Sequence, residues 1–73
     1  MEVRLLTCDA PRPDRRAITN TLETIGEGVD SSLASELTDI LLEGSPIELV
    51  LGTKYHSTGL KMLRKFQIDY EIM

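Results

Sequence analysis

The chain has 73 residues, a net charge of −4 and a hydrophobic fraction of 41%. A chain of this length builds one compact core, so we expect a single domain over residues 1–73, without a deep cleft. Its acidity and its three aromatic residues argue against nucleic acid as a partner. With one cysteine, no signal-peptide pattern and no apolar run near the roughly 20 residues of a membrane helix, we expect a cytoplasmic protein with no membrane partner.

The first quarter of the chain predicts a strand, a loop and a helix. Residues 2–8 alternate imperfectly and are rich in Val and Leu, which is typical of a strand, and the two prolines in residues 9–13 indicate a loop. Asp14 can cap a helix whose apolar residues recur every three or four positions as far as Ile25. We expect Gly26 to end this helix in a left-handed conformation.

A second helix and a second strand follow. Residues 30–32 can cap the helix, and Gly44 ends it. Its predicted core stripe has a period near 3.6 and consists of Leu33, Ala34, Leu37, Ile40 and Leu41. After a Ser-Pro turn, residues 47–51 alternate in the manner of a strand, which Gly52 ends.

The last third predicts a helix and a closing strand. Thr53 can cap the helix, and its core face consists of Tyr55, Gly59, Met62, Leu63 and Phe66. We expect Gly59 to let this helix approach the sheet closely, and residues 68–72 alternate as a strand does. The order is β-α-α-β-α-β, which predicts an α+β fold, a two-layer α/β sandwich whose three-stranded sheet carries three helices on one face.

Two stretches of the chain resemble the C-terminal domain of the bacterial ribosomal stalk protein. Residues 25–29, Ile-Gly-Glu-Gly-Val, look like the turn between the family's first two helices, and residues 46–73 match the family in length almost throughout. The resemblance implies the fold above and contact with a translation factor through the helical face. On that face it implies binding by Arg15, Arg16 and Ile18.

The start of the chain also resembles a second family of the same fold, the adaptor that delivers N-degron substrates to the Clp protease. Residues 5–9, Leu-Leu-Thr-Cys-Asp, followed by Pro13, are similar to that family's strand, acidic turn and proline. The family's Asn-Asp pair stands here as Cys8-Asp9, and its histidine falls near Leu41. The resemblance implies that Asp9 holds the α-amino end of a peptide.

No group of residues predicts catalysis, a metal site or a cofactor. His56 is the only histidine, whereas a zinc site needs three or four protein ligands. Gly26-Glu-Gly28 lacks the third glycine of a dinucleotide-binding motif and follows a helix instead of a strand. We therefore expect Cys8 to be a structural thiol and the protein to be non-enzymatic, without a cofactor.

Charge is segregated along the sequence. Between Arg16 and Lys54 there is no Lys or Arg, while seven acidic residues fall in that stretch. In the second predicted helix, Glu36, Asp39 and Glu43 form one stripe opposite the apolar face. In the third, Lys61 and Lys65 lie on a common side. Because fields of this kind steer a complementary partner, we expect these residues to bind another protein.

Three protein-binding functions follow from these observations. The first is a stalk-like module that contacts a translation factor or another protein through its helical face. The second is a Clp-adaptor-like protein or a mimic of one. The third is a small acidic regulator, of cellular or phage origin, whose acidic helix blocks a basic site on another protein, a host protein in the phage case. Self-association is compatible with all three.

Overall fold

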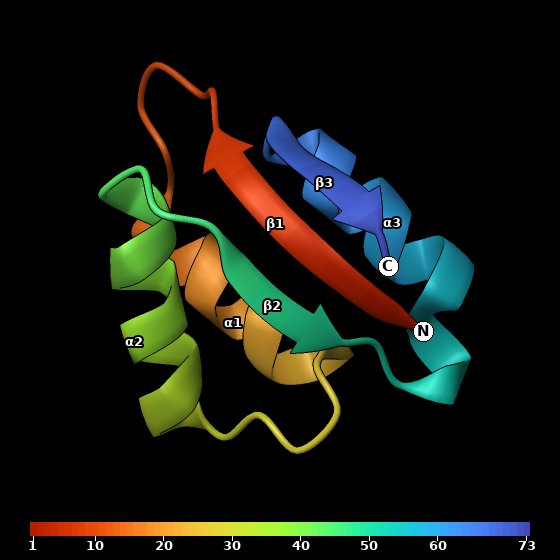
Figure 1. The fold of residues 1–73 in the computed structure, drawn as a ribbon. Coiled ribbons are helices and arrows are strands. Elements are labelled where there is room, and N and C mark those ends of the chain that lie inside the picture. Colours follow the sequence, from red (N-terminus) through yellow and green to blue (C-terminus); the bar gives the residue numbers. More distant parts are fainter.

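The computed structural model describes all 73 residues as one sheet backed by one layer of helices (Figure 1). The elements follow one another as β1 (Glu2–Cys8), α1 (Arg15–Ile25), α2 (Ser31–Leu42), β2 (Ile47–Val50), the short 3-10 helix η1 (Thr53–Tyr55), α3 (His56–Lys65) and β3 (Ile68–Ile72). The predicted α+β class and the order β-α-α-β-α-β are confirmed.

The first strand of the chain is the middle strand of the sheet. The spatial order is β2-β1-β3, and both pairings are antiparallel. In Figure 1 strands pass in front of α1 and α3, α2 lies to the left of β2, and no helix covers the near face of the sheet, which is therefore bare. On the bare face Arg4 forms ion pairs with Glu48 of β2 at 3.6 Å and with Glu71 of β3 at 3.1 Å. One guanidinium thus links the three strands.

A β-bulge interrupts the pairing of β1 with β3. Leu5 pairs with Tyr70 and Thr7 with Asp69, so Leu6 is an extra residue in β1. The bulge reverses the alternation of side chains beyond it. Cys8, which pairs with Ile68, therefore packs against the core, and its Sγ donates to the Phe66 carbonyl at 3.4 Å.

The core lies between the sheet and the helices and is aliphatic. Its residues are Val3, Leu5, Ile18, Leu22, Ile25, Ala34, Leu41, Ile47, Leu49, Leu51, Leu63 and Ile68. In α2 the predicted stripe is too wide, because Leu33 and Ile40 are each 40% exposed. The inward residues are Ala34, Thr38 and Leu41. Since each residue turns the helix by about 100°, a helix at the edge of the layer buries only this narrow stripe.

A glycine follows each of the first two helices, but the two glycines have different backbone conformations. The glycine after α1 does not have the conformation that we expected. Gly44, which we expected to end α2, follows the helix in the left-handed conformation, with φ of 96°. Gly26 instead has φ of −83°, so it is not left-handed. An added Cβ at Gly26 would lie 2.6 Å from Val29 and 2.8 Å from Leu49, so this position requires glycine for space. The left-handed residue of this connection is Gly28, with φ of 74°.

The third helix begins later than expected. Thr53 opens η1, and α3 starts at His56 without a side-chain cap. An added Cβ at Gly59 would meet Ile25 and Leu51 at 3.6 Å, an ordinary van der Waals distance. An alanine would therefore fit at this buried position, so the packing of α3 does not require glycine there. After α3, Gln67 adopts the left-handed conformation with φ of 58°, where glycine is the usual residue.

Candidate protein-binding surfaces

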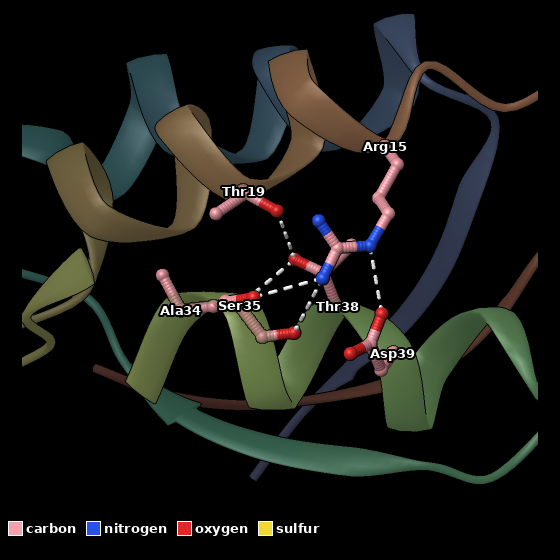
Figure 2. A network of polar contacts seen from close by, with 6 residues as sticks. All are labelled: Arg15, Thr19, Ala34, Ser35, Thr38 and Asp39. Atoms are coloured by element: carbon pink, nitrogen blue, oxygen red, sulfur yellow. Dashed lines mark hydrogen bonds and ion pairs between the residues drawn. The ribbon is translucent and has the colours of Figure 1, made fainter. Parts of the chain in front are cut away.

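A polar network joins α1 to α2 (Figure 2). Arg15 Nε donates to Asp39 Oδ1 at 2.7 Å, and Arg15 Nη2 donates to Ser35 Oγ at 2.8 Å. One turn along, Thr19 Oγ1 donates to Thr38 Oγ1 at 2.9 Å, and Thr38 Oγ1 donates to the Ala34 carbonyl at 2.8 Å. These contacts fix one side of α2 against α1 and satisfy the buried Thr38 hydroxyl.

The ion pair of this network changes the ionisation of both partners. The hydrogen bond from Arg15 holds the pKa of Asp39 below its usual value, and the Asp39 carboxylate raises the pKa of Arg15 by the same contact. Both side chains are about half exposed, at 48% and 55%. Because their charges neutralise each other, neither is a free charge for a partner.

The residues that the stalk resemblance implied do not form one exposed surface. Arg15 is engaged with α2, and Ile18 is 1% exposed within the core. Arg16 is exposed and forms no ion pair. Of the three, only Arg16 offers a free charged group.

The solvent-facing side of α2 combines free acids with exposed apolar groups. We call Leu33, Glu36, Ile40 and Glu43 the α2 outer face. The two apolar residues lie seven positions apart, as do the two glutamates, so each pair lies on one line along the helix. Glu36 and Glu43 are exposed and form no ion pair. Residue type and spacing predicted the acidic half, whereas the apolar half had been assigned to the core.

Asp9 lies beside a second carboxylate that the adaptor resemblance does not include. Hydrogen bonding to Asp69, and then repulsion from its charge, raise the pKa of Asp9. The two residues meet because Asp69 pairs with Thr7 in the sheet, two residues before Asp9. Such contacts between the two ends of a chain are not visible in sequence spacing.

A groove of about 410 Å³ lies between the loop after β1 and the turn after α3. We call it the loop groove, and its lining residues are Ala10, Pro11, Arg12, Pro13, Asp14, Ile18, Lys65, Phe66 and Gln67. Lys65 thus lies in a concave site, whereas Lys61 lies on the exposed side of α3 outside it. The prolines around Arg12 were the only local sign of a shaped loop here.

No family model, curated protein or solved structure matches the chain. No helix has the length and apolar character needed to cross a membrane. The structure contains no group of three or more His, Cys, Asp or Glu side chains placed to hold a metal ion.

Proposed function

We propose that the chain is a non-enzymatic, cytoplasmic protein-binding module whose contact surface is the α2 outer face. The partner is a protein surface that offers Lys or Arg beside apolar side chains. The observation that carries this proposal is that Leu33 and Ile40 are each 40% exposed beside two carboxylates that have no partner in the chain. A cytoplasmic location agrees with a single free thiol.

The α2 outer face combines the two contributions that protein recognition uses. Exposed apolar side chains gain free energy when a partner removes them from water. Carboxylates at the margin steer a basic partner and speed its association. Glu36 and Glu43 belong to the stretch without Lys or Arg, so no nearby cation of the same helix competes for them. This arrangement supports the acidic-regulator form of the function.

A charge reversal on one helix tests the proposal. The wild-type chain and the Glu36→Lys/Glu43→Lys variant are immobilised, and proteins retained from lysate at low and high salt are identified and purified. The control variant, Glu23→Lys/Glu27→Lys, makes the same change of charge at exposed positions of α1 and its following turn. We expect calorimetry to show that the first variant binds the purified partner roughly tenfold more weakly, and the control no more than about twofold.

The apolar half of the face has its own test. Leu33→Ser with Ile40→Ser removes exposed methyl groups and keeps both glutamates. We expect the fold to persist, because both side chains lie outside the core, and the affinity to fall. If this variant and the Glu36→Lys/Glu43→Lys variant both bind the partner as tightly as the wild type does, the α2 outer face is not the contact surface.

In a second form of the protein-binding function, which the resemblance to the ribosomal stalk domain implies, the partner is a translation factor. It is supported by the residue 25–29 turn and by the exposed, unpaired Arg16. A translation factor retained by the immobilised chain and lost on Arg16→Glu supports this form. Retention of other proteins alone contradicts it.

A second candidate function is Clp-adaptor-like binding of a peptide amino end. The observation that favours it is that Asp69 pairs with Thr7 in the sheet and so lies near Asp9, because two nearby carboxylates offer an α-ammonium group more acceptors than one. Peptides with a bulky free N-terminal residue are titrated against the wild type and Asp9→Ala. Binding that is lost in the variant and on N-acetylation supports this function, and no binding contradicts it.

A further inference from the structure

The loop groove is a second candidate site, on a part of the molecule that the α2 outer face does not include. It has two walls. The first is the loop after β1, which contributes Pro11, Arg12 and Pro13, and the second is the end of α3, which contributes Lys65 and Phe66. Its volume of about 410 Å³ lies toward the small end of the range for ligand pockets. It therefore has room for a short segment of peptide.

The two walls are held together by hydrogen bonds between them. The Asp9 N–H donates to the Gln67 carbonyl at 2.9 Å, and the Cys8 thiol donates to the Phe66 carbonyl at 3.4 Å. Pro11 and Pro13 restrict the backbone of the loop between them. A groove built in this way loses little conformational freedom when it binds, so weak contacts suffice for measurable affinity.

The charges that line the groove are mainly positive and free. Arg12 and Lys65 form no ion pair anywhere in the chain. Asp14 also lines the groove, but its Oδ1 accepts the Ala17 N–H at 3.0 Å and so caps α1. In a protein of net charge −4, two unpaired cations at one concave site favour an anionic occupant.

The rest of the lining is apolar. Phe66 is half-buried and packs against the core, and Ile18 is a core residue that reaches the groove. An occupant that matches the whole lining has an apolar side chain next to a carboxylate. We propose that the loop groove binds an extended peptide segment in which a large apolar residue adjoins an acidic one, with the carboxylate held between Arg12 and Lys65.

The test uses two tetrapeptide probes, N-acetylated and C-amidated, with the sequences Gly-Leu-Asp-Gly and Gly-Leu-Asn-Gly. Each is titrated into the ¹⁵N-labelled chain, and amide shifts are followed. We expect the Asp peptide to shift amides of residues 10–18 and 65–67 and to bind roughly fivefold more tightly than the Asn peptide, because only a carboxylate pairs with both cations. Equal binding of the two probes overturns the proposal.

Matched variants locate the site. Arg12→Gln with Lys65→Gln removes the two cations of the groove, whereas Lys54→Gln with Lys61→Gln removes two exposed cations outside it. We expect the first variant to lose the preference for the Asp peptide and the second to keep it. Shifts centred on α2, or equal loss in both variants, overturn the proposal. An unchanged amide spectrum outside the groove shows that each variant is folded.

Discussion

Arg15 Nε and Asp39 Oδ1 lie 2.7 Å apart and join the start of α1 to the middle of α2. The stalk resemblance had placed Arg15 on one binding surface, and the charge pattern had placed Asp39 on another. Packing of α1 against α2 brings them together, and the contact with Ser35 adds a second bond from the same guanidinium. The acidic stripe of α2 is thereby reduced to Glu36 and Glu43, which are the free carboxylates of the α2 outer face.

The ion pair predicts a pH dependence of stability. Arg15 lowers the pKa of Asp39 in the folded chain below its ordinary value of 3.8, so the pair stabilises the fold above that pH and loses its effect as the pH falls through the lowered value. We expect Asp39→Asn to melt at a lower temperature than the wild type at pH 7. The difference shrinks as the pH falls below 3.8. Circular dichroism melts check this, with Glu36→Gln as the control, and a difference independent of pH would contradict the role of the pair.

The Asp9 carboxylate predicts a pH dependence of stability opposite in sign to that of the Arg15–Asp39 pair. Asp69 raises the pKa of Asp9 above 3.8 in the folded chain, so the protonated form favours folding, and repulsion grows as the pH rises through the raised value. We expect Asp9→Asn to raise the melting temperature at pH 7 and to lose this advantage below pH 3.8. Glu23→Gln, at an exposed carboxylate without an ion pair, is the control. A lower melting temperature for Asp9→Asn at pH 7 would show that the carboxylate is stabilising.

Replacement of Gly26 and of Gly59 by alanine should change the free energy of unfolding in opposite directions. Gly26→Ala places a methyl group 2.7 Å from the Leu22 carbonyl and should destabilise the fold by about 1–3 kcal/mol. Gly59→Ala has ordinary contacts and removes glycine from a helix, so it should stabilise the fold by up to about 1 kcal/mol. Urea unfolding of both variants measures the free energies, and equal effects would contradict the packing at Gly26.

The hydrogen bond between Thr19 of α1 and Thr38 of α2 predicts that the losses of unfolding free energy on replacing the two threonines do not add. Thr38→Val leaves the part-buried Thr19 hydroxyl without its acceptor and should cost about 1 kcal/mol of unfolding free energy. Thr19→Val/Thr38→Val removes both hydroxyls and keeps their shapes, so it should be closer to the wild type than Thr38→Val alone. Denaturant unfolding of the wild type, the two single variants and the double variant measures the coupling, and strictly additive losses would contradict it.

The helices and strands were predictable because their signals are local. Asp14 and Asp30 accept the backbone N–H groups of Ala17 and Leu33, as their positions before apolar stripes indicated. The end of α2 was also correctly predicted, because Ser45 N–H bonds the Ile40 carbonyl at 3.2 Å around the left-handed Gly44.

The surfaces were less predictable because they depend on contacts between distant segments. Leu33 and Ile40 fit a helical period as well as any core residue, and only the position of α2 at the edge of the layer leaves them exposed. The loop groove joins Arg12 to Lys65, and the Asp9–Gln67 hydrogen bond that closes it links opposite ends of the chain. Spacing along the sequence carries no information about such pairs.

The extra residue in β1 decides which way the protein's one thiol points. If residues 2–8 alternated strictly with Leu6 in place and no bulge, Cys8 would face the bare side of the sheet, on the same side as Arg4. With the bulge, Cys8 is half-buried and its sulfur donates to the Phe66 carbonyl. The bulge therefore keeps inward a cysteine that would otherwise be a surface thiol able to cross-link two molecules, and deletion of Leu6 would leave it inward because Thr7 and Cys8 would keep their partners in β3.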